Sequence, residues 1–303
     1  MEKKIILAIF VLFIFGFFFW QGIYLPKTPF GEEKLFLVEK GQSLFQIAEN
    51  LEKEGLIKNK FFFDFYIFIK GVQRKLQAGE YFLSPSESIA RIAGKIISGD
   101  IAKVVVTIPE GFTVKQIEEK LNLKLPGENL EGFLFPDTYY LPVDVTPEKV
   151  VEIMTTNFDK KMAPFKEEIE GQGKTIFEIV IMASLLEKEV KTFEDKELVS
   201  GILWKRLKNN IPLQVDATIS YITGKQTTRI SREETQIDSP YNTYKYLGLP
   251  IGPICNPGID SIKAAIYPKN SQYWYYLSTS EGKTIFSETL EEHNLAKAKY
   301  LSR

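Results

Sequence analysis

Two glutamates near the end of one apolar segment are the side chains of this chain best suited to proton-transfer chemistry. Residues 175–178 form a capping-box pattern, which predicts a helix from residue 176 to about residue 190. No charged residue occurs between positions 179 and 186, so most sides of this helix are expected to be buried. At about 100° per residue, Glu187 lies on the apolar face, whereas Glu189 points the opposite way and is expected to face solvent.

An acid on a buried helix face has two interpretations. A carboxyl group in an apolar pocket keeps its proton more readily, and a protonated carboxyl is what a general acid needs. The alternative is a buried ion pair, with Lys205 or Arg206 of the next helix as the cation. Glu187 is therefore a catalytic acid or one half of a structural ion pair, and periodicity alone favours the ion pair.

Polar, turn-rich segments follow, and their residue types suit a carbohydrate ligand. Residues 213–218 predict a polar loop or short strand, and segments 239–244, 248–253 and 256–258 combine prolines and glycines with amides, hydroxyls and tyrosine rings. Ordered loops of this kind often carry binding sites. The candidate binding residues are Gln214, Asp216, Ser239, Tyr241, Asn242 and Asn256. The alternatives are stiff connections without a ligand and, for Asp216, the cap of a helix that begins near residue 218.

The elements that must position these residues follow from helix caps and helix breakers. A threonine and a proline at 146–147 predict a helix start, and the helix is expected to continue to about residue 170. Residues 194–209 have a further amphipathic pattern. Two prolines within 132–142 exclude a helix there, so this segment is expected to be a strand or otherwise extended.

The first part of the chain contains a repeat. Residues 36–47 and 106–117 are offset by seventy positions, and each runs from a β-branched and aromatic strand through a glycine turn into a helix start. The capping-box residues are Ser43 with Gln46 in the first copy and Thr113 with Gln116 in the second.

Each copy of the repeat is too small to bury its own apolar face. We therefore expect the two copies to share one core with a helix over 61–69 and a strand over 81–83. The strand, turn and helix start resemble LysM domains, so the repeat is either a glycan-binding module or a scaffold that binds nothing.

Composition narrows the classes of function. The 303 residues carry 38 basic and 39 acidic side chains, and a net charge of −1 leaves no electrostatic footprint for nucleic acid. A chain that is 44% hydrophobic is too apolar to be disordered, and its length predicts about two domains. One cysteine, Cys255, and one histidine, His293, are too few for a zinc site of nitrogen and sulfur ligands. We predict no metal and no other cofactor.

The N-terminal segment has the length and composition of a membrane span. Residues 5–25 carry no charge, and as a helix they would extend roughly 30 Å, the thickness of a bilayer core. Lys3 and Lys4 precede the segment, so the positive-inside rule predicts a cytoplasmic N-terminus and an extracytoplasmic remainder. The alternative is a cleaved signal peptide, whose apolar region is usually shorter and ends in small residues. We expect an uncleaved anchor.

Six motifs, taken in order along the chain, resemble the endolytic murein transglycosylases, the MltG-type or YceG-like family. They are EGFLFPDTY (131–139), ASLLEKE (183–189), LQVD (213–216), SPYNTY (239–244), GLPIGPICNPG (248–258) and FSETLEEHN (286–294). The family's catalytic glutamate falls on Glu187. The sequence departs from the family at Thr284, where a histidine is usual, and we expect His293 to be structural.

The resemblance implies an α+β fold in three parts. These are a cytoplasmic head and transmembrane anchor (1–27), a LysM-like βα subdomain (33–104) and a mixed α+β catalytic domain (105–303). The repeat unit 105–125 is counted with the catalytic domain, although the repeat itself would pack it with the LysM-like subdomain.

The resemblance also implies an activity and a location. The protein would be a single-pass enzyme of the bacterial inner membrane, with its catalytic domain outside the cytoplasm. It would cut nascent peptidoglycan glycan strands between N-acetylmuramic acid and N-acetylglucosamine, leave a 1,6-anhydro end, and so limit strand elongation. Its partners would be the glycan strands, the membrane and peptidoglycan synthases, with no nucleic acid.

The number of carboxylates separates this lyase from its alternatives. A hydrolytic glycosidase normally needs two acids, whereas a lytic transglycosylase can use one that first donates a proton and then removes one from the sugar's own 6-hydroxyl. Two other functions stay open at this point. One is a non-catalytic, peptidoglycan-binding scaffold of the division or elongation machinery, and the other is a hydrolytic muramidase with Asp216 as its second carboxylate.

Overall fold

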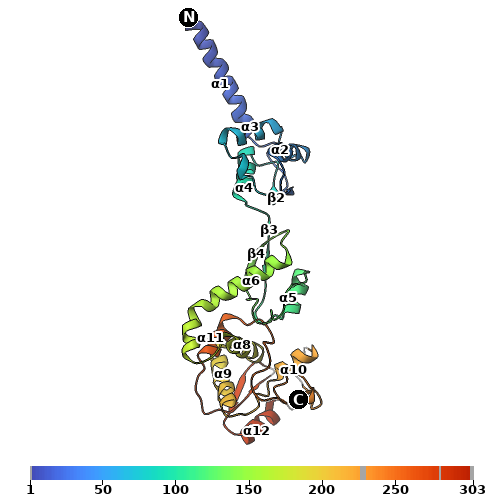
Figure 1. The fold of residues 1–303 in the computed structure, drawn as a ribbon, viewed down its shortest axis with the longest axis vertical. Helices are drawn as coiled ribbons and strands as arrows, with labels where there is room; N and C mark the ends of the chain where they lie inside the picture. The colour runs from blue at the N-terminus through green and yellow to red at the C-terminus, as the bar shows by residue number, and fades with distance from the viewer. Residues whose placement is uncertain (1, 226–229, 280, 301–303) are drawn as a thin grey trace. The chain divides into compact units, whose positions relative to one another are not determined.

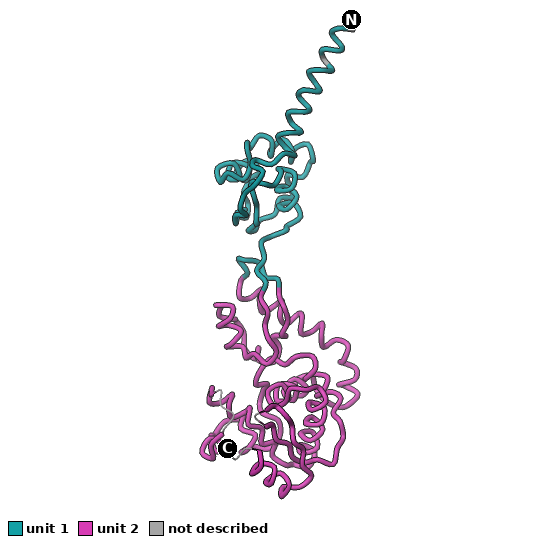
Figure 2. The backbone as a smooth tube through the Cα atoms, turned by 180° about the vertical axis from the view of Figure 1, so that it is seen from behind, with its two compact units in different colours: residues 1–105, 140–145 teal, residues 106–139, 146–303 magenta. Residues whose placement is uncertain are grey.

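Two compact units make up the computed structural model, which describes residues 2–225, 230–279 and 281–300. Unit 1 comprises residues 1–105 and 140–145, and unit 2 comprises residues 106–139 and 146–303 (Figure 2). Helices predominate, and the strands of the described residues form three two-stranded sheets. The predicted mixed α+β fold is therefore confirmed.

Unit 1 starts with a long apolar helix and continues with alternating strands and helices (Figure 1). Its elements are α1 (Glu2–Tyr24), β1 (Lys34–Val38), α2 (Leu44–Lys53), α3 (Lys60–Lys70), the 3-10 turn η1 (Gln73–Lys75), β2 (Gly79–Leu83) and α4 (Ile89–Ser98). Strands β1 and β2 are antiparallel, with Phe36 opposite Tyr81. Helix α1 is long and apolar enough to cross a membrane, and a signal sequence would have the same properties.

The predicted repeat is present as two strand, turn and helix units. Strand β3 (Lys103–Thr107) precedes α5 (Val114–Leu121) in the second copy, as β1 precedes α2 in the first. Ser43 and Thr113 each form the predicted capping box, in which the hydroxyl accepts from the backbone N–H of Gln46 or Gln116. The helix starts were thus predicted correctly.

The expected common core of the two copies was wrong. The buried cluster of unit 1 runs from Phe36 to Ile96 and takes in the first copy, α3, β2 and α4. Ile117 of the second copy is buried, yet it is not a member of this cluster. The reason is strand pairing: β3 pairs with β4 (Thr138–Pro142) and not with the β1–β2 sheet, so the second copy is not added to the first.

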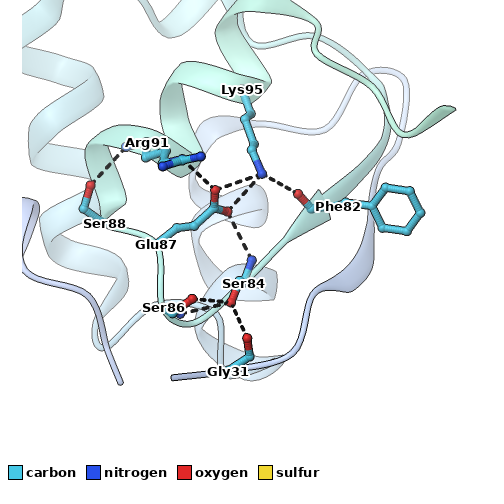
Figure 3. A network of polar contacts seen from close by, with 8 residues as sticks. All are labelled: Gly31, Phe82, Ser84, Ser86, Glu87, Ser88, Arg91 and Lys95. Carbon is cyan, nitrogen blue, oxygen red and sulfur yellow. Dashed lines mark hydrogen bonds and ion pairs between the residues drawn. The ribbon is translucent and has the colours of Figure 1, made fainter. Parts of the chain in front are cut away.

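A polar network ties the turn between β2 and α4 to the segment that follows α1 (Figure 3). The carboxylate of Glu87 lies 2.9 Å from both Arg91 Nε and Lys95 Nζ, and it accepts from the backbone N–H of Ser84. The hydroxyl of Ser84 donates to the carbonyl of Gly31 at 2.9 Å. The chain leaving α1 is therefore held against the folded part of unit 1.

Unit 2 consists mainly of helices. Besides α5, its elements are α6 (Pro147–Met162), η2 (Ala163–Phe165), α7 (Lys166–Gly171), α8 (Ile176–Glu189), α9 (Phe193–Lys208), α10 (Asp216–Thr223), η3 (Glu234–Gln236), α11 (Ile259–Ile266), β5 (Tyr275–Ser278), β6 (Thr284–Ser287) and α12 (Leu290–Tyr300). Strands β5 and β6 are antiparallel. The chain passes between the units within β3 and β4.

The helix expected to run from residue 146 to about residue 170 is interrupted. It begins as predicted, with Thr146 as the cap and Pro147 in the first turn. Pro164 lies in the 3-10 turn η2 that separates α6 from α7. Proline has no backbone N–H and disturbs the preceding helical turn, which accounts for the break.

Helix α8 is the centre of the unit 2 core, with α9 and α11 beside it (Figure 1). Every residue from Ile179 to Leu186 is buried, as the uncharged run predicted. The predicted capping box is also present, because Thr175 and Glu178 exchange side-chain and backbone hydrogen bonds. A helix buried on most sides holds its last turn, which carries Glu187 and Glu189, in a defined place.

Candidate active site

Glu187 lies in the last turn of α8 with its side chain only 10% exposed. Its Oε2 atom accepts a hydrogen bond from the Ser261 hydroxyl at 2.5 Å and from the Gly258 backbone N–H at 3.1 Å. Lys196 Nζ lies 3.4 Å from the same oxygen. Among the described residues, Oε1 has one hydrogen-bond donor, Lys196 at 3.5 Å. The two oxygens of this carboxylate therefore have different surroundings.

The expected surroundings of Glu187 require correction. The cation beside it is Lys196 and not Lys205 or Arg206. Lys205 donates to the carbonyls of Ser271 and Tyr273, and Arg206 donates to Leu213 and Gln214. Helix α9 begins four residues after α8 ends, which brings the first turn of α9 beside the last turn of α8. The carboxylate therefore lies among polar donors and not in a wholly apolar pocket.

Backbone from the second repeat copy lies against Glu187. Gly111 N–H donates to the carbonyl of Asn256 at 2.8 Å, and Asn256 N–H donates to the carbonyl of Phe112 at 2.9 Å. A Cβ atom on Gly111, whose φ is +77°, would lie 3.4 Å from Glu187 Cγ. The glycine of the repeat turn thus permits a left-handed backbone and a close approach to the candidate acid.

Glu110 is a second acid near Glu187. A Cβ atom on Gly258 would lie 1.9 Å from Glu110 Oε1, so the Glu110 carboxylate lies against the backbone of Gly258, whose N–H bonds Glu187. Partial burial raises the pKa of Glu110, and the charge of Glu187 raises it further. Sequence periodicity did not identify Glu110, because it lies in the turn before α5 and not on a helix face.

Glu131 is a third acid that sequence reasoning missed. It accepts hydrogen bonds from Val114 N–H at 3.1 Å, Asn256 Nδ2 at 3.1 Å and the Tyr221 hydroxyl at 3.5 Å. Burial raises its pKa to about 7, although the Val114 N–H, the Tyr221 hydroxyl and the charge of Lys188 act in the opposite direction. The one available signal was its place at the head of the motif 131–139.

Glu189 does not face solvent as predicted. It is half-buried and accepts from the Tyr276 hydroxyl at 3.1 Å and from the Ala217 N–H at 3.2 Å. Burial, followed by the charge of Asp216, raises its pKa to about 7. Periodicity correctly placed Glu189 opposite Glu187, but β5 and α10 cover that face of α8.

Asp216 lies near Glu189, and Gln214 lies two residues before Asp216 in the chain. Gln214 has a left-handed φ of 54°, and its side chain accepts from Arg206 at 2.9 Å. Asp216 accepts a hydrogen bond from the Tyr244 hydroxyl. The side chains of Gln214 and Asp216 are both exposed. Asp216 is the first residue of α10, with Val215 in the cap position, so its interpretation as the helix cap was wrong.

The other candidate binding residues differ in what they contact. Asn242 is buried, and its side chain bonds the backbone of Thr235, Ile237 and Tyr244, which fixes its loop. Ser239 accepts from the Tyr241 N–H, and the Tyr241 ring lies 5.0 Å from the Tyr221 ring. Asn256 is buried and bonds Glu131 and Phe112. Of the six, Asn256 is the one joined directly to the backbone beside Glu187.

His293 and Thr284 make contacts away from Glu187. His293 is buried, stacks on Tyr275 at 5.2 Å, and has a pKa that burial lowers to about 4. Thr284 donates to Asp195 at 2.8 Å. In the part of the chain that the structure describes, no three His, Cys, Asp or Glu side chains are grouped to hold a metal ion.

Comparisons with known proteins identify the family of this chain. The model of the YceG-like family matches residues 36–299. An endolytic murein transglycosylase of Bacillus subtilis is 33% identical over 306 residues, which cover 88% of this chain and 84% of that protein. One of Streptococcus pneumoniae is 30% identical over 88% of this chain and 58% of its own length.

A solved structure of a YceG-like protein is similar to this chain in its fold as well. The crystal structure of a YceG-like protein from Listeria monocytogenes has a TM-score of 0.60 and 31% identity to this chain. The match covers 88% of this chain and all of the other. The chain belongs to the YceG-like family.

Proposed function

We propose that the protein is an endolytic murein transglycosylase that cuts peptidoglycan glycan strands with Glu187 as its single acid and base. The bond cut is the β-1,4 link from N-acetylmuramic acid to N-acetylglucosamine, and the product ends in 1,6-anhydro-N-acetylmuramic acid. Cuts within a growing strand would limit its elongation. The chain's similarity to the endolytic murein transglycosylases of Bacillus subtilis and Streptococcus pneumoniae supports the activity. The unequal surroundings of the two Glu187 oxygens support the assignment of Glu187 as the acid.

Three donors hold Oε2 of Glu187, and this leaves Oε1 as the oxygen for proton transfer. Ser261, Gly258 and Lys196 all lie within 3.4 Å of Oε2. Oε1 has its one described donor at 3.5 Å, so it is the oxygen with free lone-pair capacity. A carboxyl group fixed by one oxygen and active through the other is held in one orientation for both proton transfers.

The cleavage needs only this carboxyl. Glu187 donates its proton to the glycosidic oxygen, and positive charge develops at the anomeric carbon as the bond breaks. Lys196, Ser261 and the Gly258 N–H stabilise the carboxylate that results. The carboxylate then removes the proton of the sugar's 6-hydroxyl as that oxygen closes on the anomeric carbon. No water is consumed, so the new end is an anhydro sugar.

The candidate binding residues are proposed to hold the strand on either side of the cut. Gln214 and Asp216 are exposed and carry amide and carboxylate groups, which suit sugar hydroxyls. Ser239, Tyr241, Asn242 and Asn256 belong to the loops that support this surface. Asn242 and Asn256 are buried, so we assign them to loop positioning and not to direct contact with sugar.

The domain assignment and the location form part of the same proposal. Residues 1–27 anchor the protein in the bacterial inner membrane, with the N-terminus in the cytoplasm. Residues 33–104 form a LysM-like module, and residues 105–303 form the catalytic domain outside the cytoplasm. Peptidoglycan synthases, which make the strands, are the proposed protein partners.

The test is the chemistry of the new strand ends. Full-length protein in detergent is incubated with purified glycan strands, and the products are analysed by mass spectrometry. We expect internal cuts whose ends are lighter by one water than hydrolytic ends, and a rate of cleavage that falls by about 10²–10⁴-fold in Glu187→Gln. Reducing ends would indicate a muramidase, and intact strands with correctly folded protein would indicate a scaffold, so either result would contradict the proposal.

A further inference from the structure

Helix α3 of unit 1 has an apolar face that the core does not use. Phe63 and Ile67 are fully buried in the unit 1 core. On the opposite side, Phe61, Phe68 and Ile69 are 54%, 71% and 64% exposed. Phe61, Phe65 and Phe68 follow the i, i+4, i+7 spacing that aligns side chains on one face of a helix. A run of large exposed aromatic side chains on one face indicates a binding surface.

This face continues directly into the candidate membrane span. The Phe65 ring packs against Phe19 of α1 in a tilted arrangement with ring centroids 4.1 Å apart, and the Phe61 ring lies 5.8 Å from the same ring. At Gly22 of α1, a Cβ atom would lie 2.5 Å from the ring of Phe62, so the two helices touch at a glycine. Phe19 is 8% exposed as a result. Helices α1 and α3 therefore form one aromatic contact within unit 1.

The position of this contact along α1 determines how deep the contact lies in the membrane. The candidate span runs from Lys3 to Tyr24, and Trp20 and Tyr24 are the aromatic residues expected at its outer interface. Phe19 lies five residues before Tyr24, which is about 7 Å along a helix. Interfacial helices bury their apolar faces by about 5–10 Å. The α1 contact thus places the α3 face at the depth of an interfacial helix.

The chain after α1 keeps α3 at this place. Thr28 N–H donates to the carbonyl of Pro85 at 3.1 Å, and the Ser84 hydroxyl holds Gly31 in the network of Figure 3. The segment that leaves α1 is therefore bonded to the β2–α4 turn of the same unit. A flexible linker without such contacts would not keep α3 beside α1. These hydrogen bonds restrict the movement of the segment and so keep the two helices together.

Charges around the face suit anionic lipid headgroups. The exposed basic residues near the two ends of α3 are Lys58, Lys60, Lys70, Arg74 and Lys75, of which Lys60 forms an ion pair with Glu49 at 3.5 Å. Long basic side chains at such positions can extend to the headgroups while their stems cover apolar surface. Asp64 is the acid within α3, where burial raises its pKa and Lys60 opposes that change. The charges therefore fit a lipid surface better than an apolar protein partner.

We propose that the apolar face of α3, formed by Phe61, Phe65, Phe68 and Ile69, lies in the boundary between headgroups and acyl chains of the outer leaflet. Unit 1 is then held on the membrane at two places, by the spanning helix and by α3 beside it. This inference rests on the proposed membrane anchor. Its effect is to fix the orientation of unit 1 on the bilayer surface.

The test measures the depth of single labels in the full-length chain. The protein is reconstituted in vesicles of phosphatidylethanolamine and phosphatidylglycerol, with an environment-sensitive fluorophore on one introduced cysteine. Phe68→Cys reports on the face, Leu37→Cys on an exposed apolar position of β1, and Phe13→Cys on α1. Cys255 is buried and stays in place. Ile69→Cys serves as a second probe of the face if Phe68→Cys does not fold.

We expect bromine-labelled lipids to quench the labels at positions 13 and 68, with at least twofold more quenching at 68 than at 37. Equal quenching at 68 and 37, with strong quenching at 13, would overturn the inference and leave the anchor intact. A shielded but unquenched label at 68 would mean that a second copy or another protein covers the face, which also overturns it. An unquenched label at 13 would reject the anchor itself.

Discussion

Glu187 and Glu189 lie two residues apart on α8, yet their surroundings differ in kind. Glu187 meets a lysine, a hydroxyl and a backbone N–H, which all donate to its carboxylate. Glu189 meets one hydroxyl, one backbone N–H and the charge of Asp216, and its pKa is raised to about 7. Both side chains are largely removed from solvent.

The comparison shows that burial alone does not identify a catalytic acid. Glu189 has the raised proton affinity that the sequence argument sought, whereas Glu187 has the orienting donors and the family motif position. For a reaction that uses one group as acid and then as base, a fixed orientation and a stabilised anion matter as much as proton affinity. Three experiments can separate the two roles.

The largest expected effect is on the rate of strand cleavage. Glu187→Gln should lower the rate by about 10²–10⁴-fold, because general acid–base catalysis contributes on that scale. Glu189→Gln is the matched control and should stay within a few-fold of the wild type, since the amide can keep both hydrogen-bond contacts. Cleavage is followed by chromatography of the released fragments. Equal losses in the two variants would remove the distinction between the two acids.

The next effect concerns the ion pair of Glu187. Lys196 and Glu187 have side chains only 6% and 10% exposed, so Lys196→Met leaves a buried carboxylate without its cation. We expect the free energy of unfolding to fall by about 3–5 kcal/mol at pH 7. Urea unfolding followed by Trp204 and Trp274 fluorescence measures it. The double variant of Lys196→Met with Glu187→Gln should recover most of the lost stability. A loss below about 1 kcal/mol in Lys196→Met would contradict the prediction, because it would show that Ser261 and Gly258 alone stabilise the Glu187 carboxylate.

The smallest effect is a dependence of stability on pH. The pKa of Glu189 rises from 4.5 to about 7 on folding, so the folded state binds the proton more tightly than the unfolded state. Stability from this group is present below pH 4.5 and is lost as the pH rises toward 7. The loss is about 3 kcal/mol.

The variant Glu189→Gln tests this pH dependence of stability, because it removes one titrating group. Glu131 has the same raised pKa of about 7, so the wild type should lose stability from both acids between about pH 4 and 8. The variant should lose about 3 kcal/mol less than the wild type over this range, measured by urea unfolding at each pH. An unchanged pH dependence would mean that Glu189 is not held as the structure shows.

Local signals predicted the helices well. The capping boxes at Ser43, Thr113 and Thr175 are all present, and the uncharged run of α8 is buried as expected. Each signal lies within a few residues of the feature it predicts, so the sequence window contains all the relevant atoms. The break at Pro164 was overlooked, although proline is itself a local signal.

The partners of the two acids could not be predicted in the same way. Gly258 and Ser261 are 71 and 74 positions from Glu187, and Tyr276 is 87 positions from Glu189. Periodicity tells which side of a helix a residue occupies, but it does not tell what covers that side. Glu110 and Glu131 were missed for the same reason, because they lie in loops that only tertiary contacts bring to the site.

The amino-acid sequence by itself determined where helices begin, which helix is buried and that Glu187 and Glu189 lie on opposite faces of it. Only the tertiary structure decided that Lys196 neutralises Glu187, that β5 and α10 cover Glu189, and that α3 lies against α1. The physical reason is the separation along the chain over which each effect acts. Capping and periodicity act within a few residues, whereas ion pairing, burial and the charge on a carboxyl depend on groups that the fold brings together from distant parts of the chain.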